Sequence, residues 1–98
     1  MYAAKILPEA VDDIAKAARW YARRQKGLGK RFSRAVRARV QELRQFPKSS
    51  PVRYGDMRTA VVRGFPFMVH YLVDDGTKEV VVAAVFHTST DPERWDDR

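Results

Sequence analysis

The side chains of this sequence that could do chemistry lie mainly in its second half. His87 follows a run of apolar β-formers, and Arg58 and Arg63 precede it in the chain. Cleavage of RNA beside a 2′-hydroxyl needs a base for that hydroxyl, cations for the phosphate and an acid for the leaving oxygen. His87 could supply the base or the acid, and each arginine could bind a phosphate through two hydrogen bonds. Three aromatic residues could stack on bases: Tyr54, Tyr71 and Trp95.

These residues are not a specific signature, because small basic domains often carry one histidine, two arginines and an aromatic ring. No third metal ligand stands in an obvious position beside His70 and His87, so the pattern does not indicate a metal site. We expect no cofactor. The "GLG" at 27–29 does not follow a predicted strand and is typical of a turn rather than of a phosphate-binding loop. The serines lack the context of a nucleophile elbow.

Charge gives the first indication of a partner. The net charge is +7 with an isoelectric point near 10.1, and Lys16 to Arg44 contains eleven Lys or Arg and one acid, Glu42. A basic field attracts polyanions such as nucleic acid, the ribosome or an acidic protein segment. A well-solvated helical face would give the same pattern, so composition leaves both interpretations open.

Length and composition indicate the class of protein. A chain of 98 residues predicts one domain, 1–98, which buries a modest fraction of its surface and gains from a partner. The absence of cysteine excludes disulfides and thiol chemistry and fits a reducing compartment. Neither a signal peptide nor an apolar run near the ~20 residues of a membrane span is present, so we expect a cytoplasmic protein with no membrane partner.

The first half of the chain predicts a helical hairpin. A short strand at 2–7 precedes Pro8, which suits the first turn of a helix because its missing N–H would have had no partner there. The apolar residues that follow recur at helical spacing, and a turn at 26–30 ends this helix. The second helix, from 28 to 46, has a clear apolar stripe and stops at Pro47. The short link predicts that the two helices are antiparallel.

The second half predicts a β-meander. Residues 47–56 are a loop by composition, and the period of the pattern then changes to two over 57–63, 67–73 and 79–86. "DDGTK" is a good hairpin turn between the last two strands. The order β-α-α-β-β-β implies an α+β, two-layer domain, with the first strand and the helical hairpin packed on an antiparallel sheet.

The middle strand is expected to be central, because both of its faces are largely apolar. Alternation places two sets of side chains on opposite faces, namely Phe67, Val69, Tyr71 and Val73 against Met68, His70 and Leu72. The helical hairpin can cover only one of these faces. The other is therefore predicted to be a partner surface.

Three segments, in this order and spacing, resemble the RelE/ParE family of toxins from type II toxin–antitoxin systems. They are "LGKRFSRAVRARVQELRQFP", "RTAVVRGFPFMVHYLVDD" and "VVVAAVFHTSTDPERW", which together cover nearly the whole chain. The resemblance implies a compact toxin fold of two helices on an antiparallel sheet. It also implies a cognate antitoxin that wraps the toxin in a hetero-oligomer.

The family contains two activities. RelE-like members cut mRNA in the ribosome, whereas ParE-like members inhibit DNA gyrase without nuclease chemistry. The basic residues of the nuclease pattern fall here at Thr59, Val61, Met68 and Thr90, and Trp95 is nearest to its catalytic tyrosine. These side chains cannot stabilise a developing negative charge, and losing one such contact commonly costs about 3 kcal/mol of barrier. Some family nucleases use a histidine with an arginine and a glutamate, but no convincing strand-borne glutamate accompanies His87 and Arg63.

The resemblance therefore predicts the toxin of a type II pair, a plasmid-stabilisation type of protein, acting most simply as a ParE-like inhibitor of DNA gyrase. The alternatives are a ribosome-dependent mRNA endonuclease with His87 and Arg63 as catalytic residues, and a non-toxic basic nucleic-acid-binding module. The residues predicted to contact the target are Arg58, Arg63, Tyr71 and Trp95. An acidic, partly disordered antitoxin segment would suit the charge and apolar surface, and its predicted contacts are Arg31, Arg34, Arg37, Met68 and His70.

Overall fold

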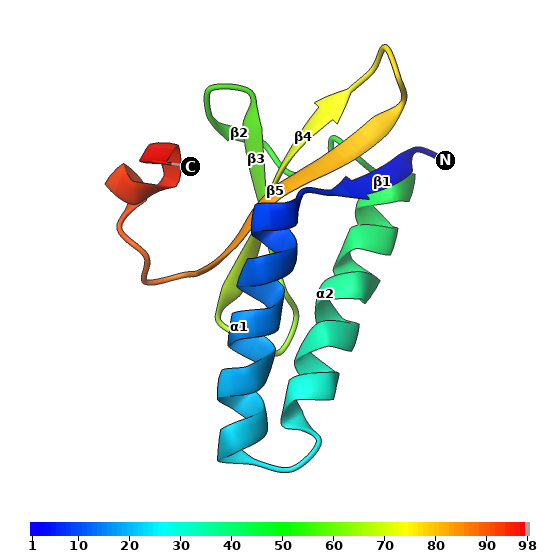
Figure 1. Cartoon of the computed structure of the whole chain (residues 1–98). Coiled ribbons are helices and arrows are strands. Elements are labelled where there is room, and N and C mark those ends of the chain that lie inside the picture. Colours follow the sequence, from blue (N-terminus) through cyan, green and yellow to red (C-terminus); the bar gives the residue numbers. More distant parts are fainter. Residues whose placement is uncertain (98) are drawn as a thin grey trace.

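The computed structural model describes residues 1–97, and the side chains of residues 1–95. Two long antiparallel helices pack on one face of a five-stranded sheet (Figure 1). The predicted α+β, two-layer architecture is confirmed. The elements follow in the order β1 (Ala3–Ile6), α1 (Pro8–Arg24), α2 (Leu28–Gln45), β2 (Val52–Tyr54), β3 (Met57–Val61), β4 (Phe67–Asp74), β5 (Glu79–His87) and the 3₁₀ helix η1 (Pro92–Asp97).

The order of strands in the sheet is β1-β5-β4-β3-β2. The first strand joins the sheet at its edge, where it runs parallel to β5 with Ala3 opposite Glu79. The sheet is therefore mixed rather than wholly antiparallel. A four-residue strand carries no information about direction, which is decided instead by the helical hairpin that connects it to the rest of the sheet.

Strand β2 lies inside the segment that the sequence predicted to be a loop. At the sheet edge, Val52 pairs with Arg58 of β3 and Tyr54 with Met57, and the turn between the two strands contains Gly55 with a φ of 51°. Side-chain contacts with β3 and β4 stabilise this strand. Arg53 Nη1 donates to Thr59 Oγ1 over 3.2 Å, and the Tyr54 hydroxyl is hydrogen-bonded to His70 Nδ1 at 2.8 Å. The surrounding Pro, Ser and Gly hide so short a strand in the sequence.

The core forms between the helices and one face of the sheet. Val69 and Tyr71 are fully buried there, with Phe67 and Val73 packed against the same cluster. Met68 and His70 point to the opposite face, so the predicted division of β4 into two faces is confirmed. The helices contribute an apolar stripe to this core, made of Ala10 and Ala17 from α1 and Phe32, Val36, Val40 and Leu43 from α2.

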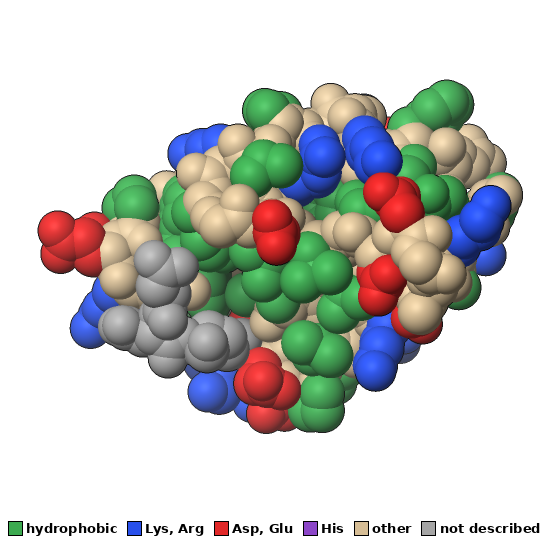
Figure 2. All heavy atoms as spheres, turned by 90° about the horizontal axis from the view of Figure 1, so that it is seen from above, with side chains coloured by type: hydrophobic (Ala, Val, Ile, Leu, Met, Phe, Trp, Pro, Cys, Tyr) green, Lys and Arg blue, Asp and Glu red, His purple; other side chains and the backbone are tan. Residues whose placement is uncertain are grey.

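A polar cluster connects residues next to the start of β1, the end of α2 and the end of β4. The Tyr2 hydroxyl donates to Asp75 Oδ1 over 2.7 Å, and Lys48 Nζ donates to Asp75 Oδ2 over 2.8 Å. The hydrogen bonds from Lys48 and Tyr2 lower the pKa of the Asp75 carboxyl. Seen from above, this end of the molecule carries carboxylates interspersed with cations and exposed apolar side chains (Figure 2).

The lowered pKa of Asp75 predicts a pH effect on stability. A carboxylate with a lowered folded-state pKa stabilises the fold above its unfolded pKa, and this contribution disappears as the pH falls through the folded pKa. Between about pH 4 and about pH 2, the range below the ordinary aspartate pKa, the native chain should lose more free energy of unfolding than Asp75→Asn. Urea unfolding at a series of pH values measures this difference, with Asp56→Asn in the β2–β3 turn as control. An equal acid-side slope for Asp75→Asn and the native chain would contradict the expectation.

None of the helices in the described part of the chain combines the length and apolarity that a bilayer span requires.

Candidate functional site

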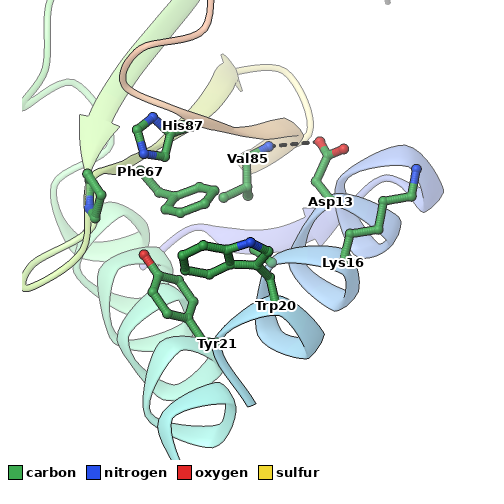
Figure 3. Close-up of a pocket in the computed structure, with 9 residues that line it drawn as sticks. Asp13, Lys16, Trp20, Tyr21, Phe67, Val85 and His87 are labelled. Carbon is green, nitrogen blue, oxygen red and sulfur yellow. Dashed lines mark hydrogen bonds between the residues drawn. The ribbon is translucent and has the colours of Figure 1, made fainter. Parts of the chain in front are cut away.

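A groove of about 520 Å³ lies between α1 and the ends of β4 and β5. Its walls are mostly apolar, and Figure 3 shows Trp20 and Tyr21 of α1 on one side of it and Phe67 of the sheet on the other. Asp13, Lys16 and His87 add polar or charged groups to the lining. We call this the Trp20–His87 groove. An apolar groove with a polar rim is the usual form of a partner-binding surface.

Local interactions hold the α1 side of the groove in place. Strand β1 ends opposite Val82, so the next part of β5 has no strand on that side, and Asp13 Oδ2 accepts the Val85 N–H over 3.0 Å instead. The Trp20 ring packs edge-on against Tyr21 at 5.1 Å, and the Arg24 guanidinium lies 4.1 Å above it. Trp20 is nevertheless 44% exposed. The structure therefore presents a large, pre-positioned aromatic ring to solvent.

His87 is the last residue of β5 and is paired with Phe67. Its Nδ1 accepts the Ser89 N–H over 3.0 Å, and the Ser89 hydroxyl lies 2.7 Å from the same atom. A backbone N–H can only donate, so Nδ1 carries no proton in this arrangement and the neutral ring has its proton on Nε2. A general base needs a free lone pair. This imidazole is therefore arranged to donate a hydrogen bond rather than to accept a proton from a substrate.

Arg63 has a different environment from His87. Its guanidinium forms an ion pair with Glu42 of α2, and the hydrogen bond from Arg63 lowers the pKa of the Glu42 carboxyl. Arg39 also reaches Glu42, at 3.4 Å, and donates to the Val61 carbonyl over 2.8 Å. The structure thus pairs Arg63 with α2 and His87 with Ser89. The two residues of the predicted nuclease pair are not brought into one contact.

The opposite face of the sheet is covered in part by the chain's own C-terminal turn. Trp95 of η1 lies with its ring centroid 4.8 Å from that of His70 and 5.2 Å from that of Tyr54. Arg53 stands over the Trp95 ring at 5.4 Å. His70 and Trp95 are both buried. Around His70, the face that was predicted to meet a partner is occupied by residues from within the chain.

Three of the four positions that the family resemblance matched to basic residues of the nuclease pattern gather on this same face. Thr59 is paired with His70 across the ladder, and Val61 with Met68. Thr59 and Met68 are buried, whereas Val61 is 54% exposed. The fourth position, Thr90, lies in the loop after β5, where its N–H donates to the His87 carbonyl over 2.9 Å.

The remaining predicted site residues are dispersed. Arg58 Nη1 donates to the Ser50 carbonyl over 2.6 Å. Tyr71 is fully buried and its hydroxyl donates to the Pro47 carbonyl over 3.0 Å, which does not favour a role in stacking on a base. The set predicted to bind an antitoxin is divided between the exposed outer side of α2 and the covered sheet face, with Arg31, Arg34 and Arg37 on the former and Met68 and His70 on the latter. Their roles remain predictions.

Trp20 and Tyr21, which form the α1 wall of the groove, were not predicted from the sequence as site residues. A signal was present, because Trp20 lies next to the apolar stripe of α1 among basic residues. A large aromatic on a charged helical face is a common feature of binding surfaces.

The chain is similar to one known protein family and to several solved structures. Residues 4–92 match the family described as the ParE toxin of the type II toxin–antitoxin system parDE. The sequence has no match among curated proteins. Solved structures with a similar fold include the intact RelBE toxin–antitoxin complex of E. coli, at 17% identity and a TM-score of 0.67, covering 89% of this chain and 96% of that chain.

Two further structures share the fold. The chromosomal ParDE system of P. aeruginosa is 17% identical with a TM-score of 0.63, covering 89% of this chain and 96% of that chain. The isolated RelE toxin of E. coli is 15% identical with a TM-score of 0.68, covering 99% of this chain and 95% of that chain. The fold is therefore common to relatives whose names point to both branches of the family.

Proposed function

Because the chain belongs to the ParE toxin family of type II toxin–antitoxin systems, we propose that it arrests growth by inhibiting DNA gyrase and that it does not cut RNA. The choice of gyrase as the target rests on one observation. The sheet face on which nuclease relatives carry cations has Thr59, Val61 and Met68 in this chain. Gyrase is a cytoplasmic enzyme, so the cytoplasm is the proposed site of action.

The chemistry of the site supports a toxin that acts by binding. Phosphodiester cleavage needs cations at the phosphate and a base at the attacking hydroxyl. Nδ1 of His87 is engaged by Ser89, and Arg63 is paired with Glu42. The Trp20–His87 groove instead offers an exposed aromatic ring and apolar walls. Such surfaces are typical anchors of protein–protein contacts.

The alternative is a ribosome-dependent mRNA endonuclease. One observation favours it, namely that His87 and Lys16 both line the groove and could contact a phosphate together. In that mechanism His87 would accept a proton at Nε2, which requires the ring proton to move to Nδ1 and the hydrogen bond from the Ser89 N–H to break.

Two parallel assays distinguish the targets. The purified toxin should block supercoiling of relaxed plasmid by gyrase, and His87→Ala should still block it, because the proposed mode needs no proton transfer. The same samples should leave mRNA intact on translating ribosomes. Supercoiling that proceeds normally, together with mRNA cleavage that His87→Ala abolishes, would replace the proposal with the endonuclease.

We also propose that the Trp20–His87 groove receives the cognate antitoxin through an acidic segment that folds on binding. The charge of the surroundings supports this choice of partner. Lys16 lines the groove, Arg24 lies on the Trp20 ring, and His87 has its Nε2–H available as a donor. A carboxylate beside an apolar anchor residue would complement this arrangement.

A further inference from the structure

A second groove, of about 610 Å³, lies between α1 and α2 and shares no lining residue with the Trp20–His87 groove. We propose that this hairpin groove binds the phosphodiester backbone of a nucleic acid. Four cations line it, one from α1 and three from α2, namely Arg19, Lys30, Arg34 and Arg37. The proposal concerns a surface separate from the one that carries the gyrase and antitoxin proposals.

Close approach of the two helices forms the floor of the hairpin groove. A Cβ atom added to Gly29 would lie 2.4 Å from the Ala18 carbonyl oxygen and 3.2 Å from the Ala22 Cβ. Only glycine fits at this crossing, because a side chain would push the helices apart. The floor is therefore made of small residues, and the long basic side chains line the groove around it.

The spacing along α2 places like charges together. Lys30 and Arg34 are four residues apart, and Arg34 and Arg37 are three apart, so their side chains are neighbours on one helix face. Neighbouring like charges destabilise a helix by a few tenths of a kcal/mol. A polyanion bound in the groove would offset this repulsion.

Intramolecular ion pairs do not neutralise these cations. From Lys16 to Gln45 the one acid is Glu42, and its carboxylate is shared by Arg39 and Arg63. The ion pairs seen in the described part of the chain are these two and Lys48–Asp75. The four groove cations take part in none of them and are all exposed. The opposite end of the molecule differs, since carboxylates and cations are mixed there (Figure 2).

The lining favours a nucleic acid over an acidic protein. Protein interfaces depend on a few aromatic or large apolar anchors that fill pockets, and the uncharged residues of this groove are Ala18, Ala22, Gly29 and Ser33. A phosphate backbone needs only cations and hydrogen-bond donors, and release of counterions drives its binding. Ser33 could add a hydroxyl donor to a phosphate oxygen. The proposed contacts are all to the phosphate backbone, so sequence-independent binding is expected.

Fluorescence anisotropy with labelled duplexes of about 20 bp of mixed sequence, one of DNA and one of RNA, tests the proposal on the purified toxin. Four phosphate contacts predict a slope of log K against log salt of about −3.6. The double variant R34Q/R37Q should reduce this slope by about two and weaken binding about tenfold or more at ~50 mM salt. The matched control K5Q/K78Q removes the same charge from β1 and the β4–β5 turn and should keep the slope of the native chain.

Each outcome decides the matter. Binding of either duplex with these slopes supports the groove, and the DNA and RNA arms identify the source of the backbone. Equal losses of duplex affinity in R34Q/R37Q and K5Q/K78Q would show that net charge alone attracts the duplex, and would overturn the proposal. An absence of duplex binding at ~50 mM salt would also overturn it. Tighter binding of a labelled oligoglutamate peptide, with the same dependence on Arg34 and Arg37, would assign the groove to an acidic protein. No gyrase is present, so failure here leaves the supercoiling result unaffected.

Discussion

Replacing Phe32 by alanine should lower the free energy of unfolding by about 3–5 kcal/mol. The Phe32 ring is fully buried where α2 meets the sheet. It contacts three other rings, those of Tyr21, Phe65 and Phe67, at centroid distances of 5.4, 5.2 and 4.9 Å. Its removal leaves a cavity between both layers and breaks aromatic contacts worth about 0.5–1.5 kcal/mol each. Small domains have total stabilities of about 5–15 kcal/mol, so a large share would be lost.

Phe46→Ala is the matched control for this experiment. The same atoms are removed, but Phe46 is 66% exposed just beyond the end of α2, so the expected change is within about 0.5 kcal/mol. Urea unfolding followed by circular dichroism measures both variants. If Phe32→Ala is too unstable to purify, Phe32→Leu gives a smaller loss in the same direction. Equal stabilities of the Phe32 and Phe46 variants would mean that the aromatic cluster does not hold the layers together.

Replacing Trp20 by alanine should weaken antitoxin binding about 30-fold to about 1,000-fold, which corresponds to about 2–4 kcal/mol. Trp20 is the largest side chain that lines the groove, and it is positioned by Tyr21 and Arg24 before any partner arrives. A pre-ordered ring loses little conformational entropy on binding. Because the ring is half in solvent, its removal should change the stability of the free toxin much less than its affinity.

Titration calorimetry with the product of the adjacent antitoxin gene measures this affinity, and unfolding curves confirm that the variant is folded. Phe46→Ala again serves as control, since it removes an exposed aromatic ring outside the groove. Native affinity for Trp20→Ala, combined with a loss for R34Q/R37Q, would move the antitoxin to the outer side of the helical hairpin. That result would also argue against the nucleic-acid role of the hairpin groove.

Much of the fold could be predicted because its signals are local. Pro8 at the start of the first helix and the apolar stripe that ends before Pro47 depend on dihedral preferences and on side-chain periodicity. The alternation along 67–73 correctly separated Val69 from His70. Strand β2 was missed because its pairing with β3 and its contact with His70 come from residues outside the segment.

The candidate site was less predictable, because it depends on which residues meet across the sheet. His87 and Arg63 were predicted as the two catalytic residues of a nuclease, yet their partners, Ser89 and Glu42, decide what each can do. Trp95 was expected to face a target and instead packs on His70. The linear sequence does not show whether an aromatic ring packs against its own chain or is exposed to bind a partner.

Periodicity, helix-terminating residues and charge composition were enough to establish the α+β class, the helical hairpin and the basic character of the chain, because these depend on neighbours within a few residues. The tertiary structure alone decided that β1 runs parallel to β5 and that Gly29 brings the basic sides of two helices together. It also decided that Trp20 lines a groove with His87 while Trp95 closes the opposite face. These outcomes arise from contacts between residues far apart in the chain. The free energy of such contacts cannot be read from the pattern of neighbouring residues.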